Sequence, residues 1–196
     1  MPSLGGLSTQ SVYLGLLALV VAERVVELVV SQRNERRLRE QGAVEHGAGH
    51  YPVMVVLHTL FLIACPAEVL LLDRPFIPWL AVISLAALLA AQSLRYWAVA
   101  SLGGRWATRV LVLPGVPPVV GGPYRWVRHP NYAAVVIEIA ALPLVHTAWV
   151  TALVFSLANA LMLRTRIRAE EAALSSANRY GEVFGTRPRF VPSGHD

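Results

Sequence analysis

Long apolar stretches separated by short polar connections dominate this chain. A helix that crosses a bilayer needs roughly 20 mostly apolar residues. Residues 11–30, 53–72 and 76–100 each reach that length; charged residues interrupt the first, and the third is the cleanest. Residues 132–163 are long enough for two shorter spans, with a nearly uncharged turn at 143–149 between them. The pattern therefore predicts five membrane-spanning helices, the last two of which form a hairpin.

The composition agrees with that interpretation. Charged residues make up 15% of the chain, whereas soluble domains typically contain about 25%. The 55% hydrophobic content excludes a disordered chain, and a single cysteine, Cys65, excludes a disulfide framework. We expect an all-α, polytopic membrane helical bundle formed by one domain over residues 1–196. Residues 11–100 would hold three N-terminal spans, and residues 101–196 a loop, the hairpin and a C-terminal helix.

The arginines predict how the bundle is oriented. All 17 basic residues are arginine, and 14 of them follow the first, third and fifth predicted spans. The opposite connections carry only Arg74, which lies beside Asp73. Because basic residues accumulate on the cytoplasmic side, we expect the N-terminus outside and the C-terminus in the cytoplasm. The net charge of +5 is thereby explained without nucleic acid as a partner. Arg, Ala, Gly and Val are abundant, a composition that suggests a bacterial genome. We therefore expect the protein to lie in a bacterial inner membrane.

The first cluster of chemically useful side chains lies at residues 121–132. Its glycines and prolines fix turns and leave backbone amides free to point at a ligand. Arg128, His129 and Pro130 stand where the fourth predicted span begins, and a helix N-terminus favours an anionic group. An interfacial anchor of aromatic and arginine side chains explains the same residues equally well.

A second cluster follows the hairpin. Arg166 and Glu170 are four residues apart, so they share one face of a helix. A guanidinium and a carboxylate at that spacing suit a ligand that carries both an amine and an anionic group. Taken alone, however, the pair is more simply explained as a helix salt bridge at the membrane edge, worth a few tenths of a kcal/mol.

The two clusters together resemble a known family. The first contains the runs Gly-Pro-Tyr-Arg at 122–125 and Arg-His-Pro-Asn-Tyr at 128–132, and the second contains Arg166 and the pair Glu170 and Glu171. In this order, and separated by a hairpin-length apolar stretch, they resemble the isoprenylcysteine carboxyl methyltransferase family. Phospholipid N-methyltransferases share the Arg-His-Pro and Glu-Glu elements. The resemblance covers roughly residues 95–191; the N-terminal half matches no motif.

The resemblance implies an integral membrane enzyme that binds S-adenosylmethionine in a cytoplasmic pocket and methylates a lipophilic acceptor. Arg166 matches an arginine that lies near the acceptor and matters for transfer, so it is a candidate catalytic and substrate-binding residue. Twelve positions match the family's cofactor pocket or lie beside it: Arg109, Val116, Pro117, Pro118, Val119, Tyr124, His129, Pro130, Asn131, Tyr132, Glu170 and Glu171.

Elementary chemistry fits these assignments. The cofactor carries an ammonium, a carboxylate and a sulfonium, so it needs a carboxylate such as Glu170 and hydrogen-bond donors near His129. Its methyl group is already activated, and the enzyme mainly has to align donor and acceptor and exclude water. Arg166 would hold an anionic acceptor. A hydroxyl acceptor also needs a base, for which His129 is the nearest candidate.

Charged residues inside the predicted spans have two explanations. Glu23 and Glu27 share a helix face, and Arg24 can reach Glu27. Intramembrane charges are functional candidates by default, but mutual neutralisation between spans accounts for them as well. Glu138, about two turns into the fourth span, is a candidate for lining the acceptor path and contacting the substrate.

The histidines do not predict a metal site. His58 and Glu68 lie inside the second span, where interhelix hydrogen bonds are a commoner role than metal ligation. His46, His50 and His195 are too scattered along the chain to form a cluster. We therefore expect no bound metal.

Several acceptors and two other classes of protein remain open. The acceptor is either a carboxylate on a prenylated thiol, a hydroxyl on an alkylated pyrone or phenol, or the amine of a phospholipid, as in a phospholipid N-methyltransferase. A non-enzymatic membrane module would use its charges only for topology and packing, and a small transporter would line a path with its intramembrane glutamates. The enzyme is favoured by the joint presence of Arg128-His129-Pro130 and Glu170-Glu171, because a packing protein does not need both at the same membrane face.

Overall fold

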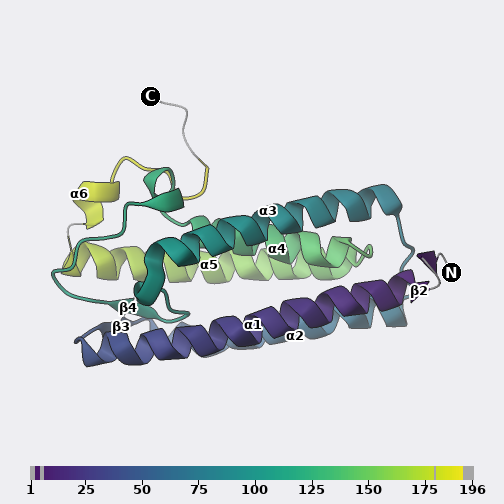
Figure 1. Ribbon diagram of the computed structural model, residues 1–196, viewed down its shortest axis with the longest axis horizontal. Coiled ribbons are helices and arrows are strands. Elements are labelled where there is room, and N and C mark those ends of the chain that lie inside the picture. The colour runs from purple at the N-terminus through teal and green to yellow at the C-terminus, as the bar shows by residue number, and fades with distance from the viewer. Residues whose placement is uncertain (1–2, 5–6, 179, 192–196) are drawn as a thin grey trace.

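The computed structural model describes residues 3–4, 7–178 and 180–191. In this part of the chain, five long helices lie side by side, each antiparallel to the one before it (Figure 1). The fold is nearly all-α, as expected. The long helices are α1 (Thr9–Glu40), α2 (Tyr51–Leu71), α3 (Pro78–Leu102), α4 (Pro130–Leu144) and α5 (Trp149–Ala177).

Short elements occupy the two ends of the bundle. Strands β1 (Ser3–Leu4) and β2 (Leu7–Ser8) pair at the N-terminal end. At the opposite end, β3 (Val44–His46) pairs antiparallel with β4 (Val110–Val112), joining two loops far apart in sequence. That loop end also carries the helix α6 (Tyr180–Phe184) and three 3-10 turns. These turns are η1 (Ala48–His50), η2 (Gly103–Arg105) and η3 (Gly122–Arg125).

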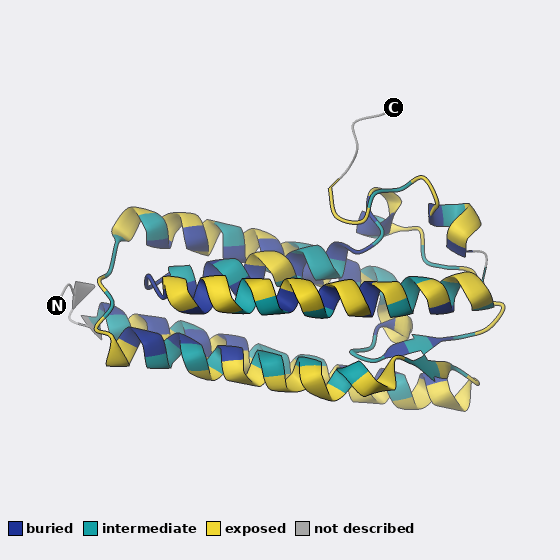
Figure 2. Ribbon diagram, turned by 180° about the vertical axis from the view of Figure 1, so that it is seen from behind, coloured by how far each residue is buried: buried dark blue, intermediate teal, exposed yellow. Residues whose placement is uncertain are grey.

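Three described helical stretches are long and apolar enough to cross a membrane: Ala48–Leu71, Pro78–Arg105 and Trp149–Ala177. The predicted count of five spans is not confirmed. In α1, Glu23, Arg24 and Glu27 interrupt the apolar run, and the 15 residues of α4 extend about 22 Å. The outward faces of the long helices are exposed (Figure 2) and carry large apolar side chains such as Leu19, Leu71 and Leu161. Lipid-facing surfaces have this character.

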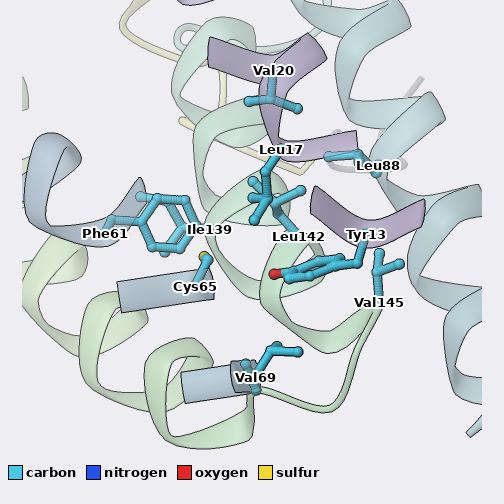
Figure 3. Packing of buried hydrophobic residues seen from close by; sticks show 11 residues of the cluster. Tyr13, Leu17, Val20, Phe61, Cys65, Val69, Leu88, Ile139, Leu142 and Val145 are labelled. Atoms are coloured by element: carbon cyan, nitrogen blue, oxygen red, sulfur yellow. The ribbon is translucent and has the colours of Figure 1, made fainter. Parts of the chain in front are cut away.

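The hydrophobic core closes the end of the bundle that holds the α4–α5 turn (Figure 3). Tyr13, Leu17 and Val20 form a stripe along α1 at helical spacing. They pack on Phe61, Cys65 and Val69 of α2, Leu88 of α3, and Ile139, Leu142 and Val145 of the α4 region. This cluster fills the interior at one end of the bundle. Other side chains line the interior toward the loop end.

The hairpin between α4 and α5 lies where the sequence predicts it, with its turn between Leu144 and Trp149. Glu68 of α2 accepts hydrogen bonds from the amides of Val150 (3.2 Å) and Thr151 (2.6 Å), which are free at the first turn of α5. The interhelix role expected for Glu68 is thus confirmed. Arg74 also pairs with this carboxylate, at 2.8 Å.

Candidate active site

A cavity of about 410 Å³ runs from the loops into the helical bundle. Its outer part, near the loops, is bounded by the ends of α4 and α5 and by residues 105–119. Its inner part lies between the middles of the long helices. Apolar side chains such as Phe61, Leu62, Val135 and Ile139 form much of its wall. The cavity therefore joins a polar mouth to a largely apolar interior.

Tyr132 connects the two key residues of α5. Its hydroxyl donates a hydrogen bond to Glu170 and accepts one from Nε of Arg166 at 2.7 Å. Arg166 also donates to the Thr108 carbonyl, and its Nη1 approaches the Met54 sulfur at 3.2 Å. The predicted sharing of one helix face is therefore correct, and a tyrosine from α4 bridges the pair within the cavity wall.

Two more tyrosines lie near Glu170. Burial and the negative charge of Glu170 raise the pKa of both Tyr124 and Tyr180, so their hydroxyls stay protonated at neutral pH. Asn131 and Asn178 also line this part of the cavity, and the Oδ1 atom of each is buried without a hydrogen-bond partner among the described residues. The outer cavity thus offers a carboxylate and two vacant amide oxygens as acceptors.

His129 lies at the N-terminus of α4, stacked on Tyr132 with ring centroids 5.3 Å apart. Its Nε2 is 3.1 Å from an oxygen of Glu171. The same carboxylate pairs with Arg128 at 3.3 Å and with Arg189 at 2.7 Å, and this contact raises the pKa of the Arg189 guanidinium. Glu171 therefore acts as the centre of an ion cluster that holds His129.

A C-terminal strap, residues 187–189, fixes the loop before α4. The amides of Arg128 and His129 donate to the carbonyls of Pro188 and Arg189, both at 3.0 Å. Arg187 donates to the Tyr124 carbonyl at 2.8 Å. We did not predict this strap, because backbone pairing over two residues leaves no pattern in the side chains.

The loop at 116–119 borders the mouth of the cavity, as the resemblance implies. Arg105 donates to the Pro117 carbonyl at 2.8 Å, and the Gly115 amide donates to the Ala177 carbonyl at 3.1 Å. Gly115 has φ +75°, a left-handed conformation that favours glycine. The turn therefore attaches the loop to the end of α5.

Arg109 lines one side of the cavity, but its positive charge is largely balanced by neighbouring carboxylates. It pairs with Glu45 at 2.6 Å and with Glu35 at 3.5 Å, and its guanidinium lies 4.0 Å from the centre of the Tyr51 ring. The contact with Glu45 raises the pKa of Arg109. Hydrogen bonds from Arg39 and Arg109 lower the pKa of Glu45. Arg109 thus closes the side of the cavity next to the β3–β4 pair.

Four charged residues meet in the inner cavity, and we call them the inner charged cluster: Arg24, Glu27, Arg95 and Glu138. Arg24 pairs with Glu27 at 2.6 Å, and Arg95 with Glu138 at 2.5 Å. Arg95 also lies 3.5 Å from Glu27, which links the two pairs. Arg24 and Glu27 thus neutralise each other, one of the two explanations that the sequence left open, and the pairing extends to α3 and α4.

Sequence reasoning missed Arg95, because it treated residues 76–100 as a clean span. The signal was present, since a lone arginine in an apolar stretch marks a functional or paired position. Gln92 was missed too; it donates to Glu23. The interhelix hydrogen bond expected for His58 is wrong: its Nδ1 lies 2.8 Å from the Met54 carbonyl within the same helix.

The cavity brings together most of the predicted site residues. The positions that line it are Arg109, Val116, Pro117, Pro118, Val119, Tyr124, His129, Asn131, Tyr132, Glu138, Arg166 and Glu170. Within the described residues, Pro130 and Glu171 do not line it; Pro130 is the first residue of α4, and Glu171 contacts the His129 ring. His195 lies outside the described residues. No group of three potential metal ligands occurs in the described part of the chain.

Apolar outward faces, helices long enough to cross a bilayer and a cavity with a polar mouth are features of an integral membrane protein. Residues 82–176 match the model of the isoprenylcysteine carboxyl methyltransferase (ICMT) family. The chain is 46% identical over 160 residues to the uncharacterized protein YpbQ of Bacillus subtilis (strain 168), covering 81% of this chain and 94% of that protein. An uncharacterized Haemophilus influenzae protein is 30% identical over 159 residues, covering 81% and 92%. The chain therefore belongs to the ICMT family of membrane methyltransferases.

Proposed function

We propose that this protein transfers a methyl group from S-adenosylmethionine to a lipophilic acceptor. The observation that carries the proposal is a single cavity with two kinds of wall. Its outer part presents Glu170, Tyr132 and Tyr124, and its inner part is lined largely by apolar helix faces. When bound, S-adenosylmethionine supplies a methyl group already activated by its sulfonium. The protein has to hold, align and shield the two reactants.

The outer cavity fits such a cofactor on its own chemistry. Buried acceptors without a partner cost about 1–3 kcal/mol each, and the vacant oxygens of Asn131 and Asn178 are of this kind. A ligand with ammonium, hydroxyl and amine donors removes that cost, and Glu170 neutralises its positive charge. We assign the cofactor to Arg109, Val116, Pro117, Pro118, Val119, Tyr124, His129, Asn131, Tyr132 and Glu170. Glu171 would orient His129, and Pro130 would support the site only as the first residue of α4.

The acceptor is assigned to the inner cavity. Arg166 stands at the junction of the two parts and is the residue we expect to position the acceptor for transfer; Glu138 lies further in. Leu28 of α1 and Val55 of α2 line the cavity and are each 42% exposed. We expect the acceptor to enter from the bilayer between these two helices. A packing module has no use for a cavity with vacant polar atoms.

We further propose that all five long helices span the bacterial inner membrane, with the cavity mouth and C-terminus in the cytoplasm. Glu27 and Arg24 of α1 pair with Arg95 and Glu138, and Glu23 accepts hydrogen bonds from Gln92 and Tyr96 of α3, so these charges do not prevent α1 from spanning. Labelling with a membrane-impermeant maleimide tests this in a Cys65→Ala background. Asp73→Cys should react in intact cells, and Arg36→Cys only after permeabilisation; the reverse result contradicts the orientation.

Titration of the purified protein in detergent micelles with S-adenosylmethionine, followed by calorimetry, tests the function directly. We expect saturable binding that Glu170→Ala weakens at least tenfold, about 1.4 kcal/mol. Glu40→Ala is the matched control, because Glu40 is an exposed glutamate at the same end of the bundle. Absence of binding, or wild-type affinity in Glu170→Ala, refutes the proposal. Mass spectrometry of lipids from cells with and without the protein then identifies the methylated species.

A further inference from the structure

His58 lines the cavity, but it is not among the residues assigned to the cofactor. It lies one helical turn beyond Met54, whose sulfur contacts Arg166, so it is about 6 Å further into the bundle along α2. Its Nδ1 is 2.8 Å from the Met54 carbonyl. A carbonyl oxygen only accepts, so Nδ1 carries the proton and Nε2 of the neutral ring keeps its lone pair. Among the described residues, Nε2 has no hydrogen-bond partner. His58 thus offers a free base to a molecule in the cavity.

The inner charged cluster beside it is built for a polar ligand group. Nε of Arg24, Nε of Arg95 and Oε1 of Glu27 are buried without partners in the described part of the chain, and so is Oδ1 of Asn159. Arg95 is only 5% exposed and Asn159 only 1%. All four residues line the cavity. A chamber that held only a hydrocarbon tail would be apolar, because vacant buried polar atoms are costly.

The charges of this chamber select among the possible acceptors. Arg24 and Arg95 each already pair with a carboxylate. A carboxylate acceptor placed here would meet Glu27 and Glu138 without an uncompensated cation in the cluster. A neutral hydroxyl meets no such repulsion, and it can donate to one group while accepting from another. A hydroxyl is also the acceptor that needs a base.

We propose that His58 and the inner charged cluster form the acceptor subsite, that the acceptor presents a neutral hydroxyl on an alkylated ring, and that His58 is the catalytic base. The inference rests on the proposed function. Nε2 takes the hydroxyl proton as the acceptor oxygen bonds to the methyl carbon and the bond from that carbon to sulfur breaks. The sulfonium charge is thereby lost, and the proton leaves the imidazolium for water at the cavity mouth. His129 is less suited as base, because its Nε2 already faces Glu171.

Charged groups on every neighbouring helix act on this step. Arg24 and Glu27 face the chamber from α1, Arg95 from α3, Glu138 from α4 and Arg166 from α5. The carboxylates of Glu27 and Glu138 stabilise the imidazolium once it forms, while the arginines oppose it. The chamber therefore holds two carboxylates that can compensate the charge His58 gains when it takes the proton.

His58→Asn tests the base with little disturbance of the helix. The asparagine amide nitrogen replaces Nδ1 as donor to the Met54 carbonyl, while the position of Nε2 is left empty. His46→Asn is the matched control, since His46 lies in β3 and does not line the cavity. The probes are pentadecylphenol and an alkylated nitrophenol that is already ionised at pH 8. Transfer is measured with radiolabelled S-adenosylmethionine in detergent micelles.

We expect His58→Asn to lower methylation of pentadecylphenol about 10²–10⁴-fold, the usual contribution of a general base. Methylation of the ionised nitrophenol should stay within about threefold, because it needs no base. In the variant, the rate on the phenol should follow ionisation of the phenol itself, because only the phenolate reacts without a base. Binding of S-adenosylmethionine should be unchanged, which also shows that the variant is folded.

A second measurement does not depend on turnover. In histidine-labelled protein, the nitrogen resonance of His58 Nε2 should shift when pentadecylphenol is added, and Arg95→Leu should weaken that binding. Equal losses on both probes, or no loss on either, overturn the role of His58. Transfer to palmitate or phosphatidylethanolamine but not to the phenol overturns the hydroxyl acceptor and leaves the proposed function standing. Failure of the wild type to bind S-adenosylmethionine overturns both.

Discussion

Two ion clusters in this protein differ in surroundings and, we infer, in purpose. The strap cluster consists of Arg128, His129, Glu171 and Arg189 at the loop end, where the Arg189 side chain is 50% exposed. The inner charged cluster lies in the middle of the bundle, and its side chains are between 7% and 19% exposed. Both combine arginines with glutamates at hydrogen-bond distance.

The difference teaches which cluster needs a functional explanation. The pair of Arg189 with Glu171 lies at the exposed edge, where ion pairs contribute about 0–1 kcal/mol, and the strap cluster gains further from the backbone hydrogen bonds that accompany it. Buried pairs lose much of their attraction to desolvation, so apolar residues of similar size would serve stability as well or better. The inner cluster is therefore better explained by what it binds than by the stability it adds.

Breaking the inner cluster should have the largest effect on stability. Arg95→Leu leaves Glu138 buried without its nearest cation and should lower the free energy of unfolding by about 3–5 kcal/mol. The double variant Arg95→Leu, Glu138→Leu should recover most of that loss and still fail to methylate pentadecylphenol. Denaturation in mixed micelles measures the first effect. A single variant as stable as the wild type would show that the pair is not effectively buried.

Breaking the strap cluster should have a smaller effect, centred on the cofactor. Glu171→Gln removes a charged acceptor shared by three donors, which is worth about 1.5–3 kcal/mol. Affinity for S-adenosylmethionine should fall roughly tenfold, because His129 loses the partner that orients it. Arg189→Gln, the control at the exposed edge, should cost less than about 1 kcal/mol. If both variants bind the cofactor like wild type, the strap does not support the pocket.

Changing Glu68 should alter stability alone and so separate packing from binding. Glu68→Ala removes the acceptor for the first amides of α5 and should cost about 0.5–2 kcal/mol, as loss of a helix cap does. The site lies at the other end of α5, so affinity for S-adenosylmethionine should not change. Thermal denaturation and calorimetry on one preparation give both quantities. A matching drop in affinity would reveal coupling along α5.

The smallest effect concerns pH and the ion pair beside β3. Arg39 and Arg109 hold the pKa of Glu45 below its ordinary value of 4.5. The pair therefore stabilises the fold fully above pH 4.5, and its contribution is lost as the pH falls through the lowered value. Glu45→Gln should remove less than about 1 kcal/mol at neutral pH and flatten this dependence. An unchanged acid profile in the variant would assign the sensitivity to other carboxylates.

Much of the fold was predictable because apolar length is a local property. The predicted stretches at 53–72 and 76–100 agree with α2 and α3 to within two residues at each end, and Pro78 stands at the first position of α3. The extension of α1 to Glu40 was not predicted. Beyond the apolar run, charged residues continue the helix, and pairs such as Arg36 with Glu40 support it.

The candidate site was predictable only in part. The positions of Arg166 and Glu170 on one helix face follow from helical periodicity. That Tyr132 bridges them, and that residues 187–189 pair with the loop before α4, depends on contacts between segments far apart in the chain. The family motifs predicted the residues of the outer cavity but predicted no role for α1. The charged residues of α1 pair with Arg95 of α3 and Glu138 of α4.

By itself, the sequence determined the helical membrane character, the hairpin and the family, because each depends on residues close together in the chain. Only the tertiary structure decided that Arg24, Glu27, Arg95 and Glu138 share one chamber with His58. Side chains from four helices meet there, and no spacing along the chain encodes which faces pack together. Whether a buried charge is paired, vacant or available to a ligand depends on those neighbours.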